Sequence, residues 1–328
     1  MTKSLEAKPA LQWMAILNVT PDSFSEQEAC LPHSGIPTPE VIKACIAKAH
    51  YQIQAGASVV DVGAESTRPY AAMVPDTEEL ARLVPVLKAL RATFPEVLVS
   101  LDTRKPLVAQ TVLTEGLADW VNDVSGGLYH QQHTQNPTPS MFQVLASYYH
   151  QASEAQKARF RYVLTHSQGT PQTMQQQPTY PEGKCCETVA MALAEQACTW
   201  AKTYHLPLEA LYFDVGFGFG KTFHHNLNLL QGFKQMAERI TTYLQDANVL
   251  HGQTLINYQE AFPWLVGVSR KSMLVGAYPQ GNVPAPASPK RETLAVAAHT
   301  LAWQQGVRWF RVHDVAYHAP IGHFLEAL

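Results

Sequence analysis

Short runs of apolar residues recur along the chain and alternate with segments that have helical spacing. The runs are short and are bounded by glycine, proline and polar residues, which is typical of buried parallel strands. Between them, segments such as Glu40–Gln54 place apolar residues at helical spacing and end at a glycine, here Gly56. The eight apolar runs are Trp13–Leu17, Ser58–Val62, Val97–Leu101, Trp120–Val121, Tyr162–Thr165, Ala210–Phe213, Trp264–Val268 and Val307–Val312.

This alternation of strand and helix predicts a parallel sheet. Eight consecutive units predict a closed (β/α)8 barrel, the TIM-barrel form of the α/β class. A doubly wound open sheet is the alternative, although it does not usually collect eight consecutive units. The chain has 328 residues, a length that α/β barrels commonly use as one domain. We therefore expect a single domain over residues 1–328, with residues 1–11 as a flexible N-terminus.

A polar or charged residue follows every apolar run. Because the carboxyl ends of all strands meet on one face of a barrel, these residues are predicted to converge where barrel active sites are built. Each also has a purely structural interpretation, since an aspartate can cap a helix and an arginine can form a surface ion pair. The residues are Asn18, Asp61 with Glu65, Asp102, Asn122, His166, Asp214, Lys271, and Arg311 with His313.

The sixth run leads into a loop, Asp214–Thr222, with glycine at positions 216, 218 and 220. A P-loop needs four residues between its first glycine and the Gly-Lys-Ser/Thr, and only three separate Gly216 from Gly220. A dinucleotide fingerprint reads G-x-G-x-x-G, whereas this loop reads G-x-G-x-G. With both nucleotide motifs excluded, a carboxylate beside a glycine loop suits a flat ligand that presents a row of N–H donors.

Composition excludes several classes of protein. The chain is 46% hydrophobic and 16% charged with a net charge of −3, which gives no reason to expect a nucleic acid or a membrane surface as partner. No apolar run approaches the roughly 18–20 residues of a transmembrane helix, and residues 1–10 lack the apolar core of a signal peptide. Five cysteines without metal-ligand spacing agree with a reduced, cytoplasmic protein.

The strand-end residues form two chemical sets. One set offers acceptors and donors that match the edge of an amino-oxo heterocycle. Its members are Asp102, Asn122, Asp214 and Lys271. The other set suits a diphosphate, with a neutral oxygen ligand for Mg²⁺. Its members are Arg68, Arg311 and His313, with Asn18 as the Mg²⁺ ligand. The predicted reaction is displacement of diphosphate from a carbon attached to a heterocycle.

Seven sequence blocks resemble those of dihydropteroate synthases. They occur in the order of that family and extend from Trp13 to about Tyr317, nearly the whole chain. One of the longest is Asp214-Val-Gly-Phe-Gly-Phe-Gly-Lys-Thr222. The others are Leu17–Ser25, Gly63–Pro69, Ser100–Pro106, Val121–Gly126, Val268–Ser272 and Arg311–Asp314.

The resemblance implies a TIM-barrel transferase of folate biosynthesis. Such an enzyme joins 6-hydroxymethyl-7,8-dihydropterin diphosphate to 4-aminobenzoate and releases 7,8-dihydropteroate and diphosphate. Family members are usually cytoplasmic homodimers and are targets of sulfonamides, which mimic the aminobenzoate. The C–O bond ionises before the amine attacks, so no protein nucleophile is implied.

The resemblance also assigns roles to individual residues. The pterin would be held by Asp102, Asn122, Asp214 and Lys271, with Arg311 stacked against it. The diphosphate and Mg²⁺ would be held by Asn18, Arg68, Arg311 and His313. The aminobenzoate pocket would be lined by Thr67, Pro69 and Ser272, the last at a helix start that favours a carboxylate. The residues implied in catalysis are Asp102, Lys271, Arg311 and His313.

The chain departs from the family pattern at several places. Ala64 replaces a second glycine, the first loop runs from Ser25 to Pro39 instead of being short, and Thr165–Gly169 lacks two usual methionines. Extra residues lie around 131–157 and 245–261. Two alternatives stay open: a pterin-binding methyltransferase domain, which needs no diphosphate ligands, and a paralogue that binds pterin without turnover.

Overall fold

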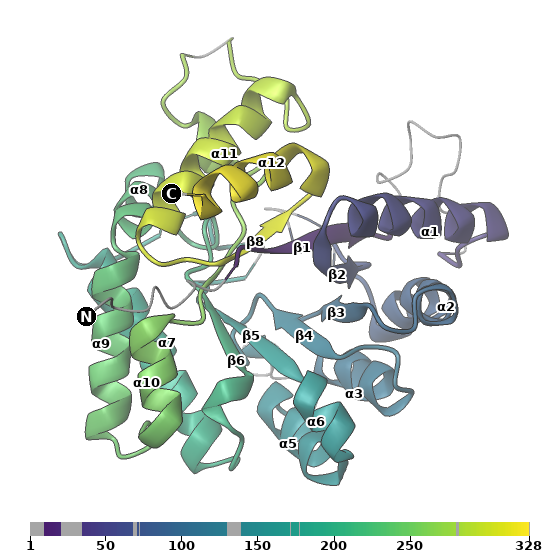
Figure 1. Cartoon of the computed structure of the whole chain (residues 1–328), viewed down its shortest axis with the longest axis horizontal. Coiled ribbons are helices and arrows are strands. Elements are labelled where there is room, and N and C mark those ends of the chain that lie inside the picture. Colours follow the sequence, from purple (N-terminus) through teal and green to yellow (C-terminus); the bar gives the residue numbers. More distant parts are fainter. Residues whose placement is uncertain are drawn as a thin grey trace.

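A computed structural model describes residues 10–20, 35–67, 71, 73–129, 139–170, 172–176, 178–279 and 282–327. In this part of the chain, eight parallel strands form one sheet, and the helices surround it (Figure 1). The strands are β1 (Gln12–Asn18), β2 (Ala57–Gly63), β3 (Leu98–Asp102), β4 (Trp120–Asp123), β5 (Arg161–Thr165), β6 (Leu211–Asp214), β7 (Leu265–Val266) and β8 (Trp309–Val312).

The sheet closes into a barrel. Hydrogen-bonded neighbours run in the order β6-β5-β4-β3-β2-β1-β8-β7. The two ends of this series meet through a parallel bridge between Phe213 and Trp264, supported by a hydrogen bond of 2.8 Å from the Phe213 N–H to the Pro263 carbonyl. The predicted (β/α)8 class is therefore confirmed. Among the described residues, no helix is long and apolar enough to cross a membrane.

The helices follow the strands as the alternation predicts. They are α1 (Pro39–Gln54), α2 (Asp76–Thr93), α3 (Pro106–Thr114), α5 (Met141–Gln151), α6 (Glu154–Arg159), α7 (Cys185–Lys202), α8 (Phe223–Gln231), α9 (Phe233–Asp246), α10 (Gly252–Glu260), α11 (Pro289–Gln304) and α12 (Val315–Glu326). Local signals set several starts: Thr38, Ser140 and Ser288 each accept a backbone N–H from the first turn of the helix that follows.

Three segments differ from the sequence prediction. The seventh strand is only Leu265–Val266, shorter than the predicted Trp264–Val268. The sequence pattern predicts one helix over 226–243, but this segment is divided at Gly232 into α8 and α9. A Cβ at Gly232 would lie 2.8 Å from Cys186 Sγ. Residues 250–260 have no clear helical pattern in the sequence, yet they contain α10. Of the extra residues at 131–157, those up to 138 lie outside the described part, and the rest include α5 and α6.

The strands alternate between two faces, and this alternation builds both the core and the candidate site. Residues facing the helices form the large outer core, for example Val60, Val62, Val99 and Val121. Residues facing inward form a separate apolar layer inside the barrel, made of Met14, Val59, Trp120, Val163 and Leu265. Two positions further along each strand, the inward side chains are predominantly polar.

Candidate active site

Arg311 belongs to the inward polar layer, because it lies two residues after the inward-facing Trp309 on β8. Its Nε donates to Asp61 Oδ2 at 2.6 Å, and its Nη2 donates to Asp102 Oδ2 at 2.5 Å. Asn122 Nδ2 donates to the same Asp61 oxygen at 3.0 Å. Four strands, β2, β3, β4 and β8, thus contribute to one connected polar group.

Asp61 is the residue whose role sequence reasoning missed. The sequence places it at a strand end but assigns it no part in ligand binding. The alternation of side chains along a strand indicates its position: Val59 faces into the barrel, and Asp61, two residues later, lies on the same face. Asp61 is fully buried, and its second carboxylate oxygen, Oδ1, has no hydrogen-bond partner among the described residues.

The electrostatics of this group are unusual because two carboxylates share one guanidinium. Burial raises the pKa of Asp102 to about 7, with Asp61 adding to the rise and Arg311 opposing it. Burial lowers the pKa of Arg311, but the charges of Asp61 and Asp102 outweigh burial and raise it overall. Asp102 is therefore partly protonated near neutral pH, whereas Arg311 stays charged.

Asp214 and Lys271 connect the glycine loop to the loop after β7. Asp214 Oδ1 accepts the Gly216 N–H at 2.7 Å, and Lys271 Nζ donates to the Phe217 carbonyl at 2.7 Å. Lys271 Nζ also lies 4.7 Å from the centre of the Phe219 ring. Burial raises the pKa of Asp214 against the effect of the Lys271 charge, and burial lowers the pKa of Lys271 to about 8. Lys271 is thus a cation that loses its proton at a lower pH than an ordinary lysine.

A second buried lysine, which sequence reasoning did not assign to the site, fixes the glycine loop. Lys221 Nζ contacts His166 Nδ1 at 2.9 Å and donates to the carbonyls of His166 at 3.2 Å and Phe219 at 3.0 Å. Burial lowers the pKa of Lys221 to about 7. Burial, together with the nearby Lys221 ammonium, holds the pKa of His166 well below its usual range. His166, predicted to lie at the strand ends, is thus engaged within the protein.

The ends of β1 and β8 complete this face. Asn18 is half-buried at the end of β1, where its backbone is paired with Gly63 of β2. His313 follows β8, and its Nδ1 lies 3.0 Å from Ser269 Oγ of the loop after β7. Ser272 is exposed and begins a four-residue 3-10 turn, η3 (Ser272–Val275), rather than an α-helix. The predicted advantage of a helix start for a carboxylate is therefore weaker than expected.

Ion pairs connect the loop after β2 to the loop after β3. Glu65 accepts from Arg104 Nε at 3.1 Å and from the Val74 N–H at 3.0 Å. Lys105, fully buried, lies 3.3 Å from Glu65 and 2.6 Å from Glu79 of α2. Glu65 therefore serves this ion network. Thr67 is half-buried at the described end of the loop, and the predicted ligands Arg68 and Pro69 lie outside the described residues.

The departure at Ala64 has a structural explanation. Gly63 faces inward, and a Cβ there would lie 3.1 Å from the Cβ of Asp102. Ala64, the next residue, is fully buried and belongs to the outer core. The glycine needed beside Asp102 is therefore kept, and the replacement fills space on the opposite face of the strand.

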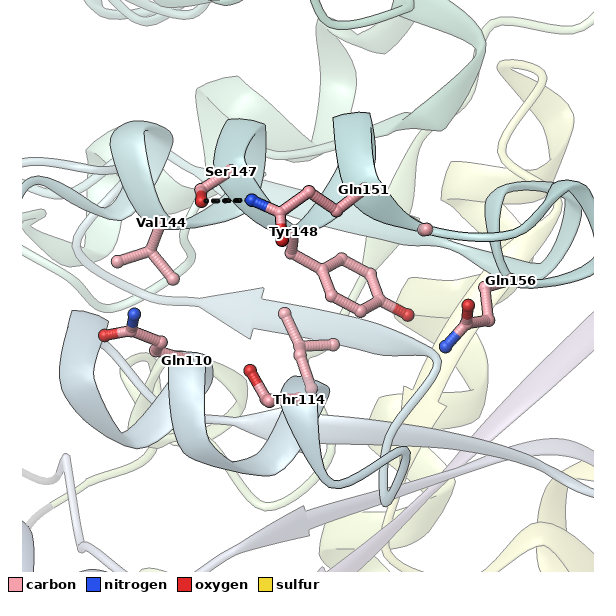
Figure 2. Close-up of a pocket in the computed structure, with 9 residues that line it drawn as sticks. Gln110, Thr114, Val144, Ser147, Tyr148, Gln151 and Gln156 are labelled. Atoms are coloured by element: carbon pink, nitrogen blue, oxygen red, sulfur yellow. Dashed lines mark hydrogen bonds between the residues drawn. The ribbon is translucent and has the colours of Figure 1, made fainter.

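A groove of about 290 Å³ lies elsewhere, between α3 and α5 (Figure 2). It is lined by the last turn of α3, by α5 and by Gln156 of α6, elements that lead into the amino ends of β4 and β5. Ser147 and Gln151 hydrogen-bond to each other along its wall, as Figure 2 shows. The groove is thus separate from the polar group at the carboxyl ends of the strands.

Comparisons with known proteins agree with this geometry. The profile of the family described as "Pterin binding enzyme" matches residues 14–313. The dihydropteroate synthase of Escherichia coli K12 is 34% identical over 307 residues, covering 92% of this chain and 86% of that protein. The chain belongs to the dihydropteroate synthase family.

Members of this family differ in length. The mitochondrial folate synthesis bifunctional protein of Arabidopsis thaliana is 30% identical over 96% of this chain, which corresponds to 49% of that protein. The chain thus spans about half the length of that relative. A structure of Xanthomonas albilineans dihydropteroate synthase with 4-aminobenzoic acid has a TM-score of 0.69 and 29% identity, covering 98% of this chain and 93% of that one.

Proposed function

We propose that this member of the dihydropteroate synthase family is itself a dihydropteroate synthase. It would join 6-hydroxymethyl-7,8-dihydropterin diphosphate to 4-aminobenzoate and release 7,8-dihydropteroate and diphosphate. The observation that carries the proposal is the connected polar group of Arg311, Asp61, Asp102 and Asn122 inside the barrel. It combines acceptors for a heterocycle with a permanent cation for a leaving anion.

Recognition of the pterin would rest on Asp102, Asn122, Asp214 and Lys271. A carboxylate can accept from an exocyclic amine and a ring N–H together, and an amide can both donate and accept. Lys271 would donate to the ring carbonyl. Because Asp102 is bonded to Arg311, a pterin that takes its oxygens must release or share that contact. Arg311 would then be available to stack on the ring or to meet the diphosphate.

Departure of the diphosphate would be the demanding step. The methylene C–O bond breaks with its electron pair going to the diphosphate oxygen, and the amine nitrogen of 4-aminobenzoate then forms the new C–N bond and loses one proton. Arg311 and His313, together with Arg68, would stabilise the negative charge that develops on the leaving oxygens. No nucleophilic side chain takes part.

Mg²⁺ fits the residues at the end of β1. Asn18 offers a neutral side-chain oxygen, a ligand type that Mg²⁺ accepts while it keeps several waters. No group of three or more His, Cys, Asp or Glu side chains in the described part is placed to hold a metal ion, so substrate oxygens would complete the site. When bound, Mg²⁺ would neutralise charge on the diphosphate.

The deciding experiment measures diphosphate release from the dihydropterin diphosphate with Mg²⁺, with and without 4-aminobenzoate. We expect aminobenzoate-dependent turnover in the parent and its loss in Arg311→Ala and Asp214→Asn. Matched controls are Arg308→Ala, at the amino end of β8, and Asp246→Asn, exposed at the end of α9; both should keep activity. Pterin binding without turnover in the parent would instead favour the non-catalytic paralogue, and methyl transfer would favour the methyltransferase.

We also propose that two copies of the chain associate through α11 and α12, which lie side by side (Figure 1). A shallow apolar hollow of about 300 Å³ lies between these helices, lined in part by Tyr317, Ile321 and Phe324. Phe324 is 64% exposed. Phe324→Glu should convert a dimer to a monomer in analytical ultracentrifugation, whereas Phe324→Leu should not.

A further inference from the structure

Glu292 of α11 connects several residues behind the candidate site. Its carboxylate accepts from Arg270 Nε at 2.9 Å and from Ser269 Oγ at 3.5 Å, and it lies 3.4 Å from His318 Nε2. Glu292 is buried at 4% exposure. Burial raises its pKa, but the hydrogen bonds from His318 and Arg270 outweigh burial and lower it overall, so Glu292 is an anion.

The backbone between Ser269 and Lys271 is held by two neighbouring residues of α11. Arg270 has φ of 61°, a left-handed conformation uncommon for a residue with a side chain. Glu292 holds the Arg270 side chain, and Arg291 Nη1 donates to the Arg270 carbonyl at 3.2 Å. This turn places Ser269 on one side and Lys271 on the other.

Ser269 links Glu292 to His313. The Ser269 hydroxyl lies between Glu292 Oε2 and His313 Nδ1, at 3.5 Å and 3.0 Å, and also accepts the His313 backbone N–H at 3.4 Å. A hydroxyl has one proton, and a carboxylate can only accept. When the Ser269 proton goes to Glu292, the Ser269 oxygen can only accept from His313 Nδ1, and that nitrogen then carries a proton.

Gln52 of α1 fixes the His313 backbone, independently of Ser269. Gln52 Nε2 donates to the His313 carbonyl at 3.1 Å, and its Oε1 accepts the Val315 N–H at 2.8 Å. With the backbone held by Gln52 and the ring by Ser269, His313 is supported on both sides. The arrangement parallels the way in which a carboxylate orients a catalytic imidazole in other enzymes.

Other titratable groups surround this series of contacts. His318 and Arg270 touch Glu292 directly, and the His299 ring is tilted against the His318 ring, with ring centres 5.0 Å apart. Lys48 of α1 and Asp314 act on the same region through their charges. Arg270 and His318 thus occupy the other contacts of Glu292, which leaves Ser269 as its connection to His313.

We propose that Glu292 is a positioning residue that acts through Ser269 to hold His313 in the form protonated at Nδ1. His313 Nε2 is then the nitrogen that gains the second proton and donates to an oxygen of the leaving diphosphate. This proposal rests on the proposed synthase activity for its kinetic consequence, but the state of the imidazole can be measured without turnover.

The test combines nitrogen NMR of His313 with kinetics. In the parent, two-bond proton–nitrogen correlation spectra should show the neutral ring protonated at Nδ1. In Ser269→Ala and Glu292→Gln, the ring should shift toward the form protonated at Nε2, and kcat should fall about tenfold or more. In Ser269→Ala, which leaves the Glu292–Arg270 contact in place, the Kd for 6-hydroxymethyl-7,8-dihydropterin, which lacks the diphosphate, should stay within about twofold.

Controls separate positioning from folding. Glu238→Gln, exposed on α9, should change neither readout, and Glu292→Asp should restore part of kcat. Since Ser269 and Glu292 act as one unit, the double variant should lose no more activity than the worse single variant. If Glu292→Gln does not fold, Ser269→Ala carries the test alone. An unchanged His313 tautomer in Ser269→Ala overturns the proposal, whereas a parent without turnover but with the predicted tautomer overturns only the synthase activity.

Discussion

The Nε atom of Arg311 donates to Oδ2 of Asp61 at 2.6 Å, although 250 positions separate the two residues in the chain. β1 lies between their strands, pairing with β2 on one side and β8 on the other. The contact therefore crosses the barrel interior above an inward-facing residue of β1. Asp61 and the other partners of Arg311 therefore influence both the stability of the barrel and whether Arg311 can contact a ligand.

Asp61→Asn should destabilise the fold with little change in shape. The substitution keeps the volume but removes the buried charge that accepts from Arg311 and Asn122. A hydrogen bond to a charged group contributes roughly 1.5–3 kcal/mol, so we expect the free energy of unfolding to fall by about 2 kcal/mol. Urea denaturation followed by circular dichroism measures it. Asp246→Asn on the surface should stay within about 0.5 kcal/mol of the parent, and an equal loss in both variants would contradict the assignment.

The alternation of strands and helices along the chain predicts part of this arrangement. The eight apolar runs place Asp102, Asn122, Asp214, Lys271 and Arg311 at the carboxyl ends of strands. The structure brings Arg311 and Asp102 into contact, joins Asn122 to them through Asp61, and lets the charges of Asp214 and Lys271 interact. The ligands that these residues hold stay a prediction.

What could not be predicted depends on contacts between distant segments. Asp61 lies in an apolar run and Asp123 follows one two residues later. The period of two places Asp61 on the inner face, but only the register of the strands brings it to Arg311, whereas Asp123 accepts from Ser125 and Gly127 of its own loop. Likewise, the sequence does not show that Lys221 contacts His166, 55 positions earlier in the chain, and the Phe219 carbonyl. Local patterns carry no information on these pairings.

Pterin binding should strengthen as pH rises through about 7. Burial raises the pKa of Asp102 to about 7, and only its charged form accepts two N–H donors. In the absence of ligand, the folded state holds this proton more tightly than the unfolded chain, so Asp102 lowers folding stability as pH rises from about 4 to about 7. Asp102→Asn should remove both dependences. Calorimetric titration with 6-hydroxymethyl-7,8-dihydropterin from pH 5.5 to 8 checks the first, and a pH-independent parent Kd would rule it out.

Turnover should decline above pH 8 because Lys271 loses its proton. Burial lowers the pKa of Lys271 to about 8, and the neutral amine is a weaker partner for a ring carbonyl and an anion. The folded state binds this proton less tightly than the unfolded chain, so Lys271 itself raises folding stability from about pH 8 to about 10.5. We expect kcat/KM to fall above pH 8 in the parent. Lys271→Met should lower kcat/KM by at least about tenfold and abolish this decline, while Lys234→Met, exposed on α9, should retain the parent profile.

Gly216→Ala should damage the site more than its backbone angle alone requires. Gly216 has φ of 66°, and a Cβ there would lie 1.9 Å from the His166 carbonyl oxygen, so the loop must move away from β5. Gly183 is a matched control, with φ of 69° and no heavy atom within 4 Å of the position that a Cβ would take. Replacing a glycine at positive φ costs roughly 1 kcal/mol for the angle.

The free energy of unfolding of Gly183→Ala should fall by about that amount in urea denaturation, and its pterin affinity should be kept. Gly216→Ala should lose at least about 2 kcal/mol more through the clash, and it should weaken pterin binding because Asp214 holds the Gly216 N–H. Equal losses in the two variants would show that the contact with His166 yields easily.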